Sequence, residues 1–233
     1  MTRPAGDDDD AATTPDVTLA DPAGVGVDLL GVVAYGELAA FTRLAANAAR
    51  ASDLAEQVEL AARAAVEMEH FGRVRERLAT QGVDVITAMA PFAATLDAYH
   101  RAVAPRDAAE SLVAAHLGRG LVADVAEAVA VHLGPEDAEL VRSVLADPDP
   151  DPVARVVRRA AADERTRDRL VLGARRLLGE ALVAATALLD AHPALTTLVD
   201  GGADAGGTAG KGRRALVKSV KSRHGKRVAA LGL

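Results

Sequence analysis

Two residues that could bind a metal ion, Glu67 and His70, lie on the apolar face of a predicted helix, the face that should be buried in the core. At about 100° per residue, they share this face with Leu60, Phe71 and Val74. An unpaired charge in an apolar core is costly, so some group has to compensate these side chains. The spacing Glu-x-x-His places a carboxylate and an imidazole close enough to bind one ion. The pattern indicates a metal site, and the competing interpretation is a hydrogen-bonded Glu–His pair in a helical core.

Three further glutamates fall on the apolar stripes of other predicted helices. Glu37 belongs to a helix over 25–50, Glu110 to one over 106–132 and Glu180 to one over 164–191, while Glu67 and His70 belong to one over 53–79. Four long helices would each carry one acid inward. We therefore expect a metal site built from Glu37, Glu67, His70, Glu110 and Glu180.

The composition favours helices and restricts the ligands that a metal could have. Hydrophobic residues make up 50% of the 233 residues, aromatic residues only 2%, and there is no Cys. A chain rich in Ala and Leu and poor in aromatic residues favours helix over sheet. Without Cys there is no thiolate ligand and no cysteine nucleophile, so carboxylates and imidazoles have to hold any metal. Such oxygen-rich ligation suits iron, with manganese as the second choice.

The net charge of −6 combines an acidic body with a basic C-terminal tail. All four Lys residues lie after residue 210, together with four Arg residues and no acid: Lys211, Arg213, Arg214, Lys218, Lys221, Arg223, Lys226 and Arg227. This asymmetry predicts that the tail either docks on the acidic body or binds a polyanion.

Proline, glycine and charge divide the chain into four parts. Residues 1–24 form an acidic segment that we expect to be disordered, 25–199 a helical bundle, 200–212 a Gly-rich linker, and 213–233 a basic helix. The chain begins without the basic and apolar regions of a signal peptide, and no uninterrupted apolar run reaches the roughly 18 residues of a membrane span. We therefore predict a cytoplasmic protein with no membrane segment.

The order Glu37, Glu67-x-x-His70, Glu110 and Glu180 resembles that of the ferritin-like di-iron carboxylate superfamily. This resemblance implies an all-α, ferritin-like four-helix bundle with additional short helices and a C-terminal basic helix. It also implies two non-haem iron ions, bridged by Glu67 and Glu110. Glu37 and Glu180 would then be terminal ligands, with His70 on one of the ions.

Three segments resemble one branch of that superfamily, the proteins similar to tRNA-(2-methylthio-isopentenyladenosine) hydroxylase. They are the extra helix over 84–103, the stretch 118–124 that begins Gly118-Arg119-Gly120, and the closing residues 227–233. The resemblance implies oxygen-dependent hydroxylation of an isopentenyl-type group on a tRNA base. An electron donor protein would be a partner, the basic tail would contact tRNA phosphates, and a homodimer is compatible with this reading.

One departure from the family pattern leaves other functions open. Val183 is found where many oxygen-activating members carry the His of a second Glu-x-x-His. The remaining ligands would suit two ions, one or none, and His224 is a candidate for the missing nitrogen. One alternative function is iron oxidation or peroxide defence without an organic substrate. The other is a metal-free helical interaction module whose inward acids pair with arginines such as Arg63 and Arg176.

Overall fold

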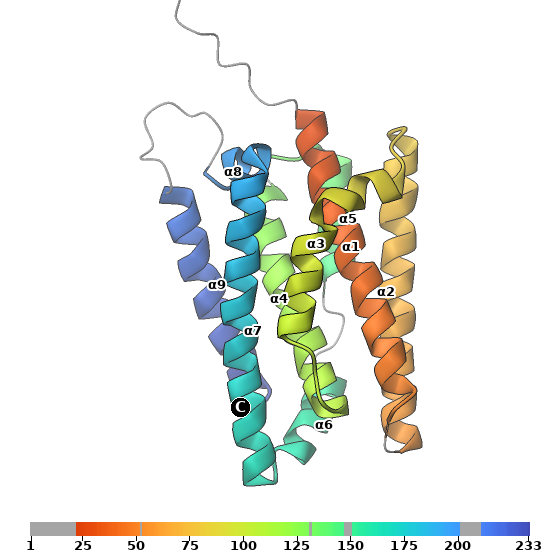
Figure 1. Ribbon diagram of the computed structural model, residues 1–233, viewed down its shortest axis with the longest axis vertical. Helices are drawn as coiled ribbons and strands as arrows, with labels where there is room; N and C mark the ends of the chain where they lie inside the picture. The colour runs from red at the N-terminus through yellow and green to blue at the C-terminus, as the bar shows by residue number, and fades with distance from the viewer. Residues whose placement is uncertain (1–21, 52, 131, 147–150, 201–210) are drawn as a thin grey trace, which may run out of the picture.

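The computed structural model describes residues 22–51, 53–130, 132–146, 151–200 and 211–233, and every regular element within them is an α-helix. The all-α prediction is therefore confirmed. The long helices run side by side along the molecule, and short ones connect them (Figure 1). In chain order they are α1 (Pro22–Ala48), α2 (Leu54–Thr80), α3 (Val85–Ala102), α4 (Ala108–Ala130), α5 (Pro135–Leu145), α6 (Asp151–Ala160), α7 (Glu164–Ala191), α8 (Pro193–Val199) and α9 (Lys211–Ala230).

Local sequence signals set the starts of three of these helices. Asp53, Asp84 and Asp163 precede α2, α3 and α7, and each carboxylate accepts a hydrogen bond from the backbone N–H three residues later, at 2.8–2.9 Å. An Asp at this position satisfies one of the N–H groups that the first helical turn leaves without a partner. At the other end of α2, Gly82 has φ 73°, a conformation that glycine adopts without strain.

The predicted boundaries differ from the structure at a few places. Helix α1 begins at Pro22, inside the segment predicted to be disordered, and α9 begins at Lys211, inside the predicted linker. Helix α8 was not predicted, because Pro193 was interpreted as the end of a helix, whereas proline also suits the first position of one. The rest of the acidic N-terminus and most of the Gly-rich linker lie outside the described residues.

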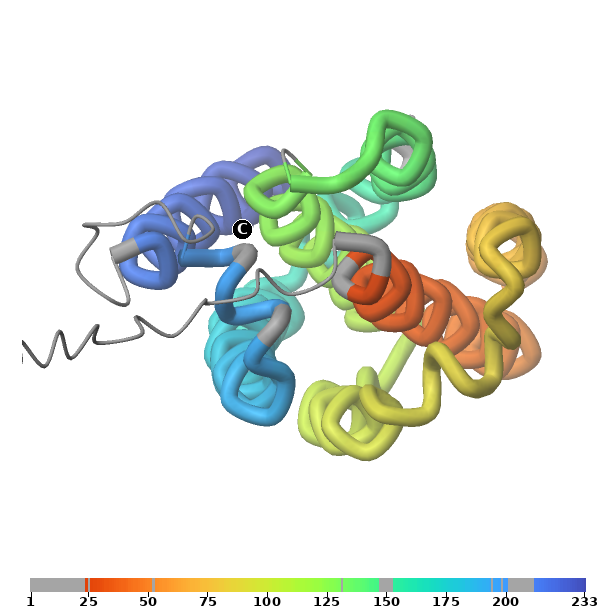
Figure 2. The backbone as a smooth tube through the Cα atoms, turned by 90° about the horizontal axis from the view of Figure 1, so that it is seen from above, coloured from red at the N-terminus to blue at the C-terminus, as the bar shows by residue number. Residues whose placement is uncertain are grey.

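Helix α1 lies between α2 on one side and α3 and α4 on the other (Figure 2). It crosses α3 closely at Gly31, where a β-carbon would overlap the backbone carbonyl of Ala88. Pro91 follows within α3, which continues as a helix to Ala102. A glycine on one helix thus permits the close crossing that brings α3 across the bundle.

The apolar core forms two main clusters of buried side chains. One is centred on Leu30, Val33, Val74, Leu78, Val141 and Val144, and the other on Leu44, Leu60, Leu112, Leu117, Leu170 and Leu177. Along α1 and α2, the buried acids Glu37 and Glu67 lie in sequence between the residues of these two clusters. The acids therefore occupy the middle of the bundle rather than an end.

Within α1, the stretch Gly26–Ala48 is long and apolar enough to cross a membrane by length and composition alone. In the structure its side chains Leu30, Val33 and Leu44 are at most 2% exposed. Over the most apolar window of this stretch, 39% is buried, so packing inside the bundle accounts for part of its apolar character.

Helix α9 packs on the body of the bundle. This agrees with the prediction that the basic tail docks on the acidic body. Val220 and Leu231 are buried in the core cluster around Leu117. Arg223 and Arg227 bind the carboxylate of Asp124 on α4, whose side chain is 2% exposed. We call Asp124, Arg223 and Arg227 the Asp124 cluster.

Candidate metal centre

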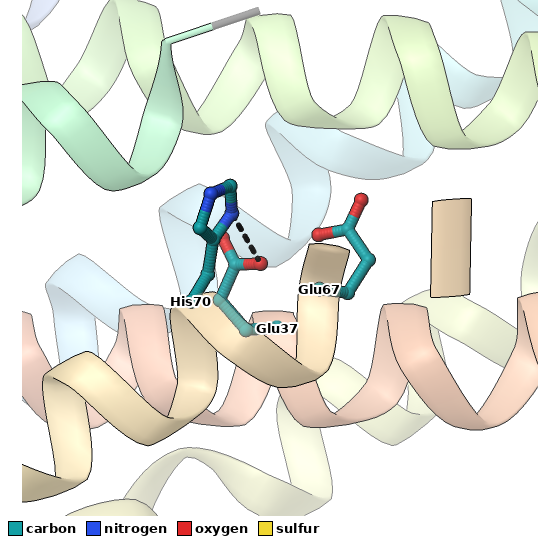
Figure 3. A group of neighbouring side chains, drawn as sticks. All are labelled: Glu37, Glu67 and His70. Atoms are coloured by element: carbon teal, nitrogen blue, oxygen red, sulfur yellow. Dashed lines mark ion pairs between the residues drawn. The ribbon is translucent and has the colours of Figure 1, made fainter. Parts of the chain in front are cut away.

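Glu37 of α1 and Glu67 and His70 of α2 point toward one another in the middle of the bundle (Figure 3). One potential ligand atom from each residue lies within 4.8 Å of the other two. His70 Nδ1 is 3.6 Å from Glu37 Oε2. The three residues are 4%, 5% and 9% exposed, so they form a buried group of two carboxylates and one imidazole.

Arg119 of α4 closes this group. Its guanidinium donates to Glu67 Oε2, lies 3.5 Å from Glu37 Oε2 and 3.4 Å from His70 Nδ1, and donates to the backbone carbonyl of Val144 at 2.7 Å. The Arg119 side chain is only 8% exposed. We call Glu37, Glu67, His70 and Arg119 the acid cluster.

The helical period places each of these side chains inward. On α2, Glu67 and His70 are one turn apart on the buried face that also carries Leu60, Ala64 and Val74, as predicted. On α4, Arg119 follows Leu112 and His116 along one face, and those two residues are buried. The acid cluster thus results from ordinary amphipathic stripes in which polar residues replace apolar ones.

Burial controls the protonation of the acid cluster. It raises the pKa of Glu67 to about 7, with further contributions from the hydrogen bond and the repulsion that Glu67 shares with Glu37. Burial also raises the pKa of Glu37, which the hydrogen bond with Glu67 and the charge of Arg119 oppose. Burial and the charge of Arg119 lower the pKa of His70. At neutral pH the imidazole is therefore uncharged and has a lone pair that can bind a metal.

These protonation states determine the net charge of the acid cluster and therefore whether it can bind a cation. With one proton on Glu67, the negative charge of Glu37 and the positive charge of Arg119 balance. When that proton leaves, the cluster carries one uncompensated negative charge in a buried place. A cation can replace the proton, so a metal ion and a proton compete for the same carboxylates.

Glu110, predicted to bridge two metal ions, has other partners in the structure. One carboxylate oxygen accepts from the backbone N–H of Arg106 at 2.7 Å, and the other accepts from Arg169 of α7 at 2.7 Å. Arg169 also pairs with Asp107 at 2.5 Å. Glu110 thus ties the start of α4 to α7, and the structure does not bring it into the group of Glu37, Glu67 and His70.

Glu180 and His224, the other predicted ligands on α7 and α9, also lie apart from that group. The buried stripe of α7 runs through Leu170, Ala174 and Leu177, and Ala181 continues it, so Glu180 lies at its half-exposed margin. His224 is buried, with Nε2 3.1 Å from the carbonyl oxygen of Ala174. The buried stripe of α7 passes through Ala181, one residue after Glu180, so Glu180 does not occupy the buried position that was predicted for it.

The acid cluster opens onto a largely apolar cavity of about 250 Å³. Glu37, Glu67 and Arg119 are part of its wall, which residues of α1, α2, α3, α4, α7 and α9 line. The cavity is present because many of the side chains that line it are small. They are Gly36 and Ala40 on α1, Ala114 and Gly118 on α4, and Ala181, Ala184 and Ala185 on α7. The volume is close to the lower end of the roughly 300–1,000 Å³ that ligand pockets have.

The fold and this site together define a helical bundle with a buried carboxylate and imidazole group between its long helices. The family model described as "Ferritin-like domain, actinomycetes" matches residues 22–202. Because this match spans most of the chain, the protein belongs to that ferritin-like family, which confirms the predicted superfamily. No curated protein matches the sequence.

The donors at the acid cluster fit one divalent metal ion. Carboxylate oxygen and imidazole nitrogen suit iron, manganese or zinc, and the two Glu and one His offer one ligand atom each. Within the described part of the chain, no second group of three such donors lies together. Arg119 is the residue that the sequence analysis did not assign to the site. The sequence nevertheless marks Arg119 as unusual, because it is the one Lys or Arg residue in the apolar helix α4.

Proposed function

We propose that this protein binds one iron ion, or in its place manganese, through Glu37, Glu67 and His70, and that it is an oxygen-dependent hydroxylase of an apolar group. The observation that carries the proposal is that the acid cluster forms part of the wall of the apolar cavity. An organic substrate could lie in that cavity beside the carboxylates. This arrangement favours hydroxylation over iron oxidation or peroxide defence, neither of which needs an organic substrate.

A bound iron ion would supply the reduction of dioxygen, which side chains alone cannot carry out. The chain itself would hold the ion with Glu37, Glu67 and His70, orient the substrate along the apolar wall and keep bulk water away. In the metal-free chain the Glu67 carboxyl group has a pKa of about 7, so binding of the ion near neutral pH would displace a proton from it.

Hydroxylation of a C–H bond by dioxygen also consumes two electrons and two protons and releases water. The electrons would come from an electron donor protein. The apolar group would belong to a modified tRNA base if the resemblance to the tRNA hydroxylase branch extends to the substrate. In that case the exposed Lys218, Lys221 and Lys226 of α9 would contact phosphate, since Arg223 and Arg227 already bind Asp124.

A second function, a metal-free helical interaction module, is favoured by one specific contact. Arg119 donates to Glu67 and to the carbonyl of Val144, so a guanidinium already compensates part of the buried negative charge. The sequence suggested Arg63 and Arg176 for such pairing, and in the structure Arg119 pairs with Glu37 and Glu67. In this case the acid cluster would hold the bundle together and bind no metal.

The metal content of the purified protein separates these two functions. We expect anaerobic titration of the metal-free chain with Fe(II) to reach about one ion per chain. Glu67→Gln and His70→Ala should each weaken binding at least tenfold, as loss of a ligand does. Arg119→Met should strengthen it, because the guanidinium no longer competes for Glu67.

Glu69→Gln is the matched control, since Glu69 is an exposed neighbour on the same helix. It should bind Fe(II) like the wild type. If the wild type takes up neither Fe(II) nor Mn(II), and neither ion raises its melting temperature, the metal site is refuted and the interaction module is supported.

A further inference from the structure

The wall of the cavity includes a cation that has no counter-ion in contact with it among the described residues. Arg43 of α1 lines the cavity, and it makes no hydrogen bond or ion pair with another of the residues that the structure describes. The carboxylates of Glu67 and Asp97 act on it only from a greater distance, and burial lowers its pKa. A guanidinium in such apolar surroundings is stabilised by an anion that binds against it.

His100 and Tyr99 of α3 add two polar groups to the same wall. Both ring nitrogens of His100 are buried and have no hydrogen-bond partner among the described residues. Burial and the charge of Arg43 lower the pKa of His100 to about 3, so the ring is neutral and one of its nitrogens carries a hydrogen. Burial raises the pKa of Tyr99 to about 12, so its hydroxyl keeps its proton. Three donors thus line one wall.

Much of the remaining lining of the cavity is apolar. Along α1 the lining runs from Leu29 and Val32 past Glu37 to Arg43. Leu188 and Leu189 of α7 also line it. Arg43 follows Glu37 by six residues, which corresponds to about 9 Å along a helix. A ligand bound at Arg43 would therefore extend past the acid cluster before it reaches the leucines.

We infer that the cavity binds an unbranched aliphatic chain that ends in one anionic group. The anion lies against Arg43, His100 and Tyr99, and the methylene groups run along α1 past Glu37. The inference rests on the proposed function insofar as this chain would be the substrate. Binding itself requires no metal, so it can be tested on the metal-free protein.

The test is a calorimetric titration of the metal-free wild type with decanoate and, separately, with decanol. Because a charged hydrogen bond contributes to one and not to the other, we expect decanoate to bind at least tenfold more tightly. Arg43→Gln should remove this preference and leave the affinity for decanol unchanged. Decyl phosphate is titrated in parallel, and the tighter of the two anions identifies the head group as carboxylate or phosphate.

Arg175→Gln is the matched control, because Arg175 is exposed on α7 and does not line the cavity. It changes the net charge equally and should keep the preference for decanoate. Ala185→Leu should weaken both ligands by reducing the cavity. The inference is overturned if neither anion binds, if both bind no more tightly than decanol, or if Arg43→Gln and Arg175→Gln behave alike. Failure to bind Fe(II) would instead affect only the proposed metal site.

Discussion

Two clusters, each built around a buried residue of α4, combine arginine and carboxylate in opposite proportions. In the acid cluster, Arg119 faces the two carboxylates of Glu37 and Glu67. In the Asp124 cluster, the single carboxylate of Asp124 receives two hydrogen bonds from Arg227, at 2.6 and 2.7 Å, and a longer one of 3.3 Å from Arg223. The first cluster has an excess of acid and the second an excess of base.

This difference separates a candidate binding site from a structural contact. Asp124 has every oxygen engaged by side chains that α9 supplies, and Gly120 leaves the space that Arg227 needs, since a β-carbon there would overlap it. In the acid cluster, by contrast, one carboxyl group keeps its proton to near neutral pH. An acid cluster that Arg119 does not fully neutralise can still accept a cation, whereas the Asp124 cluster cannot.

The largest effect should come from Asp124→Ala. This change leaves Arg227 without its carboxylate in a place where its side chain is 25% exposed. Breaking a buried pair by removing one partner costs about 3–5 kcal/mol. Because Arg227 and Arg223 are partly exposed, at 25% and 45%, we expect the lower end, about 3 kcal/mol, in the free energy of unfolding from urea titrations. Removal of the exposed Glu127, which also pairs with Arg223, should cost less than about 1 kcal/mol. Equal costs for the two changes would show that the Asp124 cluster does not hold α9.

The next effect concerns pH and the metal-free protein. The pKa of Glu67 rises from 4.5 to about 7 on folding, so between these values the folded state binds more protons than the unfolded state. Stability therefore falls as the pH rises through this window. At about 1.4 kcal/mol per pKa unit, the total contribution is roughly 3 kcal/mol.

Glu67→Gln removes this contribution, so at pH 8 the variant should be the more stable protein by up to that amount. Near pH 4.5 the two proteins should converge. Urea unfolding at a series of pH values measures the difference. Glu69→Gln should follow the wild-type curve throughout, and a Glu67→Gln curve that also runs parallel to the wild type would mean that Glu67 is ionised in the folded state.

The smallest effects should come from Glu110→Gln and Glu180→Gln. Glu110 shares Arg169 with Asp107, and the Glu110 side chain is 14% exposed, so we expect a cost of about 1 kcal/mol. Glu180 is half-exposed and should cost less. From the structure, neither change should alter the number of Fe(II) ions bound. A wild type with two ions, reduced to one by either change, would favour the dinuclear site predicted from the sequence.

Most of the fold could be predicted because its signals are local. Asp53, Asp84 and Asp163 mark helix starts wherever the rest of the chain lies, and the apolar period of α2 places Glu67 and His70 inward without knowledge of any other helix. The opposite case is α8, because Pro193 is compatible both with the end of one helix and with the first position of the next.

The partners of the acids could not be predicted, because they depend on how helices meet. Glu110 is partly buried in the first turn of α4, and it pairs with Arg169 of α7. Glu180 is displaced by a drift of one residue in the stripe of a long helix, a change that periodicity alone does not resolve. Arg119 was visible only as an isolated cation in an apolar helix. Its pairing with Glu37 and Glu67 requires the relative positions of α1, α2 and α4.

The scarcity of aromatic residues has a practical consequence for spectroscopy. The chain contains no Trp and two Tyr residues, and Tyr99 lines the cavity while Tyr35 donates a hydrogen bond to Asp97 at 2.5 Å. Absorbance near 280 nm and emission near 300 nm therefore originate from these two phenols alone. A Tyr35→Phe variant would retain a single native chromophore on the wall of the cavity, and its emission would report occupancy without any attached dye.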